Sequence, residues 1–276
     1  MSGKVRTDGG LVRVFCRGAA LAAFLFVLAG TGCEDGWETL LVTAQVTRTL
    51  GVPSNTASVL VGKVSIVNVF SDDWLETPDP GDSTFWQHDP LPGRVTPVGG
   101  AMVHVGNRAV GQRVPGVYFQ AALDLEFKQR YELSIETPDG KNVTGQAWLP
   151  DSFAVVEPGQ GASLHPDSVR VTWTRSDSAR TYLVGVAPVD TLNPAQGWAD
   201  GRSDTTCLVP RAAFEDTLGN LAPGAFYVTV TAVNGGWKKS TLDLILAGGN
   251  LSGAAGTFGC AVMPPPAFFE VRTPAP

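Results

Sequence analysis

Short stretches in which apolar and polar residues alternate, separated by turns rich in glycine and proline, recur along most of this chain. The clearest stretch is 130–137, where Tyr131, Leu133 and Ile135 alternate with polar residues. The turn at 138–141 contains a glycine that can adopt a positive φ, and 142–148 follows as the partner strand. A period of two predicts strands with one buried face, and turns at short intervals predict an all-β fold.

The strand pattern divides the chain into two β domains. Residues 149–161 are rich in proline and glycine and indicate a boundary. The sequence therefore predicts two antiparallel β-sandwiches in tandem, at 40–150 and 151–263, each of ordinary domain size. A tail at 264–276 begins with three consecutive prolines, and we expect it to be partly disordered.

The N-terminal stretch has the parts of an export signal. Four basic residues, Lys4, Arg6, Arg13 and Arg17, precede an apolar run at 19–29. Three small residues then lead to Cys33. This arrangement predicts a secretory signal peptide at 1–32, and the apolar run is shorter than the roughly 20 residues of a permanent membrane span.

The residues 28–33, Leu-Ala-Gly-Thr-Gly-Cys, resemble a bacterial lipobox. The resemblance implies cleavage before Cys33, diacylation of its sulfur with chains such as palmitate, and a tether at 33–39. Gly30 departs from the pattern, which usually has an aliphatic residue there, and an ordinary secretory signal with Cys33 incidental is the alternative. The acidic residues Glu34 and Asp35 resemble sorting signals for the surface or outer membrane of some bacteria.

The charge of the chain bears on its expected partners, and its cysteine content bears on a possible disulfide. From Cys33 onward the chain keeps 16 of 20 basic and 25 of 26 acidic residues, a net charge of −9. No basic run is present, so nucleic acid is not an expected partner. With Cys16 in the leader and Cys33 acylated, Cys207 and Cys260 remain, and an oxidising envelope favours a disulfide between them over two buried free thiols.

Both domains resemble known sandwiches. The segments 100–105, 116–118 and 131–135 resemble the prealbumin-like or carboxypeptidase-regulatory-type sandwich. The second domain resembles the fibronectin type III fold. That resemblance rests on a tryptophan and a tyrosine in the second and third strands and on an L-x-P-G-x-x-Y corner: Trp173, Tyr182, Leu221, Pro223, Gly224 and Tyr227. It implies a tyrosine corner, in which Tyr227 buries its ring and its hydroxyl bonds to backbone upstream.

The C-terminal stretch 250–259, with an Asn-aliphatic-x-Gly start and a Gly-x-Phe-Gly end, resembles the signature of a bacterial outer-membrane lipoprotein family of unknown function. Its members join an N-terminal sandwich to a fibronectin-like one. Membership would imply association with a TonB-dependent outer-membrane transporter or another surface system.

Two long connections are the candidate contact surfaces, 71–97 and 189–206. The first combines carboxylates with aromatics that could hold a sugar, a cation or a partner, and its candidate binding residues are Trp74, Phe85, Trp86, His88 and Asp89. The alternative is a solvated loop whose aromatic rings pack on its own sandwich. We find no catalytic or metal-binding motif, and the sequence predicts no cofactor.

These features favour a non-enzymatic, lipid-anchored protein of the bacterial cell envelope that acts as a binding or assembly module at the outer membrane. The alternative is a surface carbohydrate-binding protein or hydrolase that uses the 71–97 loop.

Overall fold

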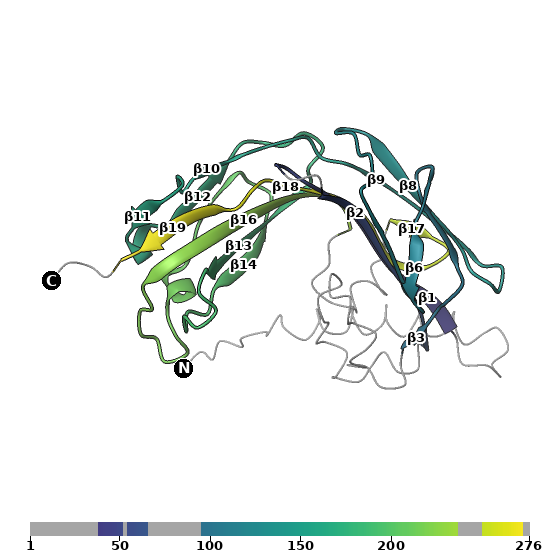
Figure 1. Ribbon diagram of the computed structural model, residues 1–276, viewed down its shortest axis with the longest axis horizontal. Helices are drawn as coiled ribbons and strands as arrows, with labels where there is room; N and C mark the ends of the chain where they lie inside the picture. Colours follow the sequence, from purple (N-terminus) through teal and green to yellow (C-terminus); the bar gives the residue numbers. More distant parts are fainter. Residues whose placement is uncertain (1–37, 52–53, 66–94, 237–249, 273–276) are drawn as a thin grey trace, which may run out of the picture. The chain divides into compact units, whose positions relative to one another are not determined.

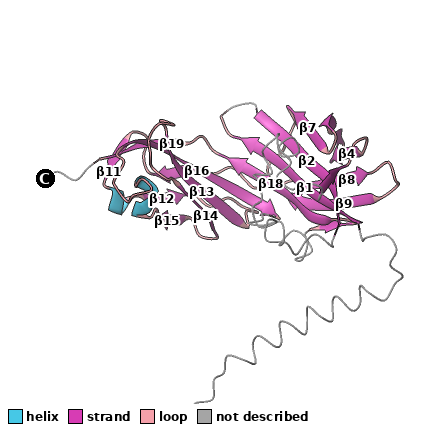
Figure 2. Cartoon of the chain, turned by 90° about the horizontal axis from the view of Figure 1, so that it is seen from below, coloured by secondary structure: helices cyan, strands magenta, loops and turns pink. Residues whose placement is uncertain are grey.

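The computed structural model describes residues 38–51, 54–65, 95–236 and 250–272, and residues 39–276 belong to one compact unit. This unit is all-β and consists of two β-sandwiches that share one large sheet (Figures 1 and 2). The order along the main path of the shared sheet is β11-β19-β16-β18-β1-β2-β7-β6. The all-β sandwich fold predicted from the strand pattern is confirmed.

In the first sandwich a five-stranded sheet packs on one half of the shared sheet. The five strands are β17 (Leu251–Ser252), β9 (Asn142–Trp148), β8 (Arg130–Glu136), β4 (Met102–Val105) and β5 (Arg108–Ala109). The facing half contains β18 (Ala255–Met263), β1 (Glu38–Thr49), β2 (Ser54–Ser65), β3 (Val95–Pro97), β7 (Val117–Ala121) and β6 (Gly111–Val114). Alternate residues such as Val42, Val59 and Ile135 are fully buried between the sheets, as the period of two requires.

In the second sandwich a three-stranded sheet packs on the other half. Its strands are β10 (Val155–Glu157), β12 (Arg170–Trp173) and β15 (Thr206–Leu208). The facing half contains β11 (Ala162–Leu164), β19 (Ala267–Val271), β16 (Gly224–Gly235), β13 (Thr181–Pro188) and β14 (Trp198–Arg202). Two short 3₁₀ helices, η3 (Pro166–Ser168) and η4 (Arg211–Phe214), lie between strands. The buried apolar side chains of both sandwiches form one continuous core.

The long strand β16 joins the two sandwiches. Its first residues, 224–228, pair with β19, whereas 232–235 pair with β18, which also pairs in parallel with β1. Residues 251–263 therefore lie in the first sandwich, where the sequence had placed them in the second. Within the predicted tail at 264–276, residues 267–271 form β19 beside β16. Prolines lack the N–H needed to continue the β18 ladder, so the chain leaves β18 at Met263 and enters β19.

Among the described strands two pairs are parallel, which differs from the expectation of purely antiparallel sheets. They are β1 with β18 and β11 with β19. In both cases a strand near the end of the chain returns beside one much earlier in the sequence. A pattern of local turns indicates hairpins and cannot indicate these long-range pairs.

Side-chain contacts hold the two sandwiches together where β16 passes from one to the other. Asn234, which is 7 % exposed, accepts a hydrogen bond from the backbone N–H of Trp148 in β9 at 3.1 Å and donates one to the carbonyl of Ser178. Lys128 forms ion pairs with Asp151 at 2.8 Å and Asp177 at 3.0 Å. These hydrogen bonds and charges raise the pKa of Lys128, and Lys128 lowers the pKa of Asp151.

The fibronectin-like motif is confirmed in part. Trp173 and Tyr182 are buried against each other, with ring centroids 5.4 Å apart. The predicted tyrosine corner at Tyr227 is wrong: Phe226 is fully buried, whereas Tyr227 is half-buried on the opposite face of β16. The second half of the motif, Gly224 to Tyr227, begins the strand β16, whose alternation directs Phe226 inward. Tyr182 is the tyrosine of this sandwich that bonds to backbone, accepting from the N–H of Ser176 at 2.8 Å.

The C-terminal signature has a structural explanation. The Asn250 amide donates to the carbonyls of Gln146 and Phe258 and accepts from the N–H of Phe258, at 2.9, 2.6 and 2.8 Å. Gly256 has φ +123°, and an added Cβ would lie 1.8 Å from the carbonyl oxygen of Val42. These residues therefore close the first sandwich between β9, β18 and β1.

The predicted disulfide is not formed. Cys207 and Cys260 are both free and buried, with Cys207 in β15 of the three-stranded sheet and Cys260 in β18 of the shared sheet. Cys260 lies between Val46 and Asn234, its register partners in the neighbouring strands. The alternative of two buried free thiols therefore holds, and burial raises the pKa of both.

Candidate functional site

The residues predicted to form the anchor and the binding loop lie outside the described residues. This applies to Cys33 and to Trp74, Phe85, Trp86, His88 and Asp89. The structure does describe the strands that follow the predicted anchor and the predicted binding loop. β1 begins at Glu38, inside the predicted tether, and β3 (Val95–Pro97), at the end of the 71–97 loop, pairs with β2.

The second predicted contact segment, 189–206, contains β14, which is an edge strand because β13 is its one partner among the described strands. In register, Asp200 lies opposite Val184 and Arg202 opposite Tyr182, so both charged side chains are on the core-facing side of the strand. They form an ion pair at 2.8 Å, and the Arg202 guanidinium lies 5.7 Å from the centre of the Trp198 ring. Inward-pointing charges of this kind discourage an edge strand from pairing with another chain.

The opposite face of the same strands forms an open trough of about 1010 Å³, which we call the threonine trough. Its floor has three neighbouring strands, β14, β13 and β16. The residues on this face of the floor are Thr181, Leu183, Gly185, Ala199, Gly201, Thr229 and Thr231. Gly185 lies between Ala199 and Thr229, and Leu183 lies between Gly201 and Thr231. Because glycine and alanine have little or no side chain, the centre of this face is recessed between the larger side chains around it.

One threonine that lines the trough, Thr231, is 9 % exposed. Its neighbours Val230 and Ala232 point into the core, so Thr231 points to the trough side.

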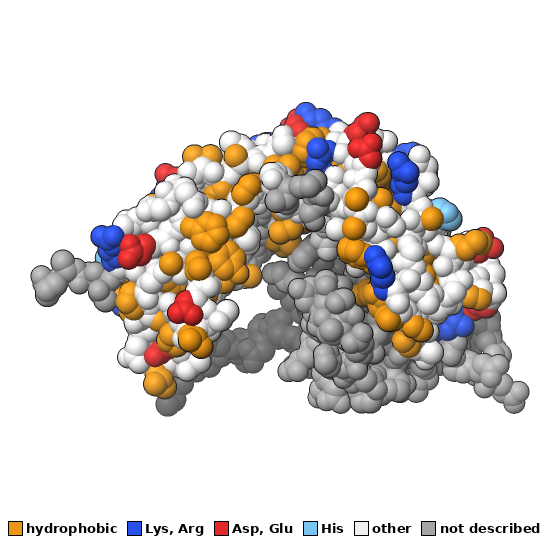
Figure 3. All heavy atoms as spheres, viewed as in Figure 1, with side chains coloured by type: hydrophobic (Ala, Val, Ile, Leu, Met, Phe, Trp, Pro, Cys, Tyr) orange, Lys and Arg blue, Asp and Glu red, His pale blue; other side chains and the backbone are white. Residues whose placement is uncertain are grey.

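Two aromatic rings lie in the next row of the same face. Tyr227 in β16 is the register partner of Phe268 in β19, and the ring centroids are 6.2 Å apart. Phe268 is 39 % exposed and Tyr227 is half-buried. In the space-filling view, hydrophobic side chains gather over β16 and β13 (Figure 3). The outer face of the second sandwich thus combines exposed rings with hydroxyl groups.

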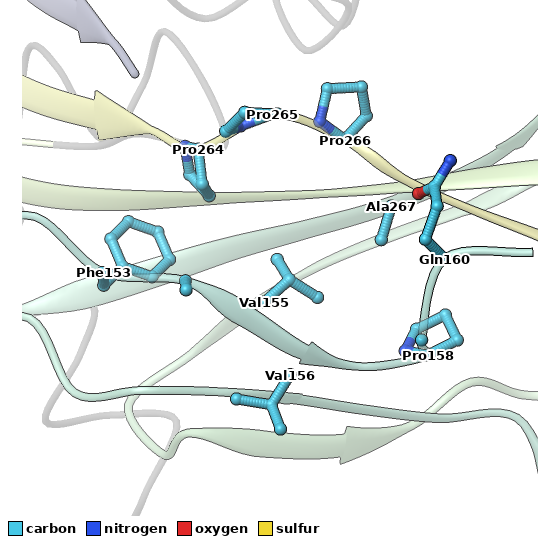
Figure 4. A pocket seen from close by; sticks show the side chains of 11 residues that line it. Phe153, Val155, Val156, Pro158, Gln160, Pro264, Pro265, Pro266 and Ala267 are labelled. Atoms are coloured by element: carbon cyan, nitrogen blue, oxygen red, sulfur yellow. The ribbon is translucent and has the colours of Figure 1, made fainter. Parts of the chain in front are cut away.

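A smaller slot of about 360 Å³ opens between β10 and the three prolines that follow β18 (Figure 4). Phe153, Val155 and Val156 line one side, and 264–266 line the other. Gln160 closes one end and accepts a hydrogen bond from the N–H of Phe268 at 3.0 Å. The described residues that line the slot are mostly apolar, and none of them is charged.

Within 38–51, 54–65, 95–236 and 250–272, no group of three or more histidine, cysteine, aspartate or glutamate side chains could hold a metal ion. Over the same ranges, no helix is both long and apolar enough to span a bilayer.

Comparison with known proteins gives distant structural matches alone. No protein-family model matches the chain, and no curated protein matches it. Among solved structures it is similar to the fibronectin(III)-like modules of Clostridium thermocellum CbhA, at 11% identity over 81% of this chain and 92% of that chain, with a TM-score of 0.21. It is also similar to DIP-gamma IG1+IG2, at 8% identity over 86% and 98%, with the same TM-score. The fold class therefore rests on the strands and their pairing in this chain.

Sequence reasoning missed the threonine trough and assigned Tyr227 to the core. The alternation in 181–187 and 225–233 carried the necessary signal, because it places Gly185 and three threonines on one face. Which of the two faces is covered by the three-stranded sheet could not be read from the alternation.

Proposed function

We propose that this protein is a non-catalytic, lipid-anchored envelope protein that acts as a binding or assembly module, accessory to a TonB-dependent transporter of the outer membrane. The observation that carries the proposal is the short distance between the lipobox-like cysteine and the first strand. Only residues 34–37 separate Cys33 from β1, which corresponds to at most about 14 Å of extended chain.

A connection this short supports an anchoring role for Cys33. If the sulfur carries acyl chains, β1 and its partners are held beside the headgroups, where a membrane protein can be reached. The residues on which the fibronectin-like and C-terminal resemblances rest lie in turns, paired strands and the core. This placement supports a structural and binding role for the protein rather than catalysis.

The test is co-purification from membranes. The full chain, with its native leader, is expressed in a bacterium with an outer membrane, solubilised in mild detergent and captured through a C-terminal tag. We expect an outer-membrane transporter to be enriched, and expect the enrichment to be lost in the Cys33→Ser variant. A chain that sediments with the soluble fraction, or the same recovered proteins with and without Cys33, would contradict the proposal.

The alternative function is a surface carbohydrate-binding protein or hydrolase that uses Trp74, Trp86 and the neighbouring carboxylates of the 71–97 loop. Its support is the composition of that loop. Release of reducing ends from polysaccharides, abolished by Asp89→Asn, would favour this alternative.

A further inference from the structure

The edge strand β14 has backbone groups that point away from β13, its one partner among the described strands (Figure 1). The N–H of Val189, directly after β13, bonds to the carbonyl of Ala225 in β16. Because backbone groups alternate in direction along an antiparallel ladder, odd-numbered residues of β13 bond to β16 and even-numbered residues bond to β14. In β14, the odd-numbered residues Ala199 and Gly201 therefore direct their N–H and C=O groups to the open edge.

The hydrogen bond of Gly201 agrees with this direction. Its N–H donates to the carboxylate of the preceding residue, Asp200, at 2.8 Å. Ala199 and Gly201 have little or no side chain, so no bulky group of theirs obstructs a strand that approaches this edge. A further strand that offers a backbone carbonyl to the Gly201 N–H can replace the carboxylate and extend the sheet.

The charges of β14 restrict which strand can be added. Asp200 and Arg202 lie on the core-facing side and form an ion pair at 2.8 Å. A strand with apolar side chains at these positions would remove water from both charges without replacing it, which is unfavourable. The Nε of Arg202 is buried and donates to no acceptor in the part of the chain that is described, so the guanidinium has a donor left for a second carboxylate. The complementary strand therefore carries the opposite charge at each of the two positions.

A second copy of β14 carries those charges in one register. When two copies pair antiparallel about a two-fold axis at Gly201, each Asp200 lies opposite Arg202 of the other copy. The charges then alternate in sign around the axis, and the two Gly201 residues form a hydrogen-bonded pair. An axis at Asp200 or at Arg202 would instead place identical charges opposite each other, which is unfavourable.

We propose that β14 is a homodimerisation edge, where two copies of this chain pair antiparallel about Gly201 and join their sheets into one. This inference goes beyond the function proposed above and does not depend on the lipid anchor or on a transporter. Because β14 has only 5 residues, the contact is small, and we expect a weak and reversible dimer.

The test is oxidative cross-linking of the full chain in detergent. Cys16 and Cys33 are first changed to serine, and Cys207 and Cys260 are buried, so an introduced cysteine is the reactive thiol. Gly201→Cys should give a disulfide-linked dimer, because the Cα atoms of a hydrogen-bonded antiparallel pair lie about 5.5 Å apart, within the range of a disulfide. A Cβ at Gly201 meets no atom closer than 3.8 Å, so the substitution is sterically tolerated.

Ala199→Cys is the matched control on the same strand. In the proposed register Ala199 lies opposite Ser203 of the second copy and far from the other Ala199. Ala199→Cys alone should therefore give little dimer, whereas a mixture of Ala199→Cys and Ser203→Cys chains should cross-link. Absence of a cross-linked dimer for Gly201→Cys would overturn the proposal, and so would Ala199→Cys alone cross-linking as well as Gly201→Cys.

Charge reversal tests the same register independently. In the Gly201→Cys chain, either Asp200→Arg or Arg202→Asp places like charges opposite each other and should slow cross-linking about tenfold. Mixing the two charge variants, one of them with an added tag, restores opposite charges and should recover a cross-linked heterodimer. Both variants lack the ion pair within their own chain, so a purely intramolecular role for that pair predicts no recovery. A mixture that cross-links no faster than either variant alone would contradict the proposal.

The lipid anchor is absent from every chain in this experiment because Cys33 is serine throughout. Failure of the dimer and failure of the anchoring role are therefore distinguishable.

Discussion

Asn234 is the side chain whose replacement should most clearly reveal how the two sandwiches are joined. Its amide bridges Trp148 of β9 in the first sandwich and Ser178 in the second, and the residue is 7 % exposed. Asn234→Ala removes both hydrogen bonds and leaves the Trp148 N–H and the Ser178 carbonyl without their partner. Each hydrogen bond contributes about 1 kcal/mol, and both are only partly buried, so we expect a loss of about 2 kcal/mol.

Asn234→Asp is a sharper variant because it keeps the shape of the side chain. One carboxylate oxygen can still accept from Trp148, but the other lies against the Ser178 carbonyl, where two acceptors repel each other. The introduced carboxyl group should therefore have a raised pKa, since only its protonated form can donate to Ser178. The destabilisation should be greatest above that pKa and should diminish as the pH falls through it.

The assay is urea unfolding of the full chain followed by tryptophan fluorescence, with exposed Asn142 of β9 changed to alanine as the control. We expect Asn234→Ala to lower the midpoint in a single transition with an unchanged dependence on urea, and Asn142→Ala to change stability by less than about 0.5 kcal/mol. If Asn234→Ala is as stable as wild type, the bridge between the sandwiches does not carry the energy assigned to it.

Three further predictions follow from single residues. Gly256→Ala should destabilise the protein by at least about 3 kcal/mol, because its Cβ would meet a backbone oxygen of β1 at 1.8 Å, whereas Gly140→Ala, with open space around it, should cost only about 1 kcal/mol in thermal unfolding. Cys207 and Cys260 should resist alkylation in the native protein and react in urea, because burial raises both pKa values; recovery of a Cys207–Cys260 disulfide peptide would contradict this. A hydrogen bond from the hydroxyl of Thr137 lowers the pKa of Asp139 to about 2. The stability lost in Asp139→Asn should therefore be full above the ordinary pKa of 3.8 and should disappear as the pH falls to about 2. A stability difference that stays the same across this pH range would refute the prediction.

Local sequence signals predicted the elements of the fold well. The alternation at 130–148 gave β8, its turn and β9, and the motif residues Trp173 and Tyr182 occupy the core as expected. Such signals depend on neighbouring residues, whose alternation and turn chemistry are fixed by local geometry.

Those local signals could not predict the pairing of strands that lie far apart in the sequence. The parallel pair of β1 with β18 joins residues more than 200 positions apart, and no local pattern indicates it. The same reason explains why residues 251–263 were assigned to the second sandwich, since the two ends of β16 pair with different strands. Tyr227 was misassigned because the corner motif was given more weight than the alternation of the strand that contains it.

The central claim is that this chain is attached to a membrane through Cys33 immediately before its first strand. Mass spectrometry of the N-terminal peptide of the protein purified from membranes tests it most directly. The account predicts a peptide that begins at Cys33 and carries the added mass of a diacylglyceryl group. A peptide that retains residues 1–32, or one with an unmodified Cys33 thiol, would contradict it.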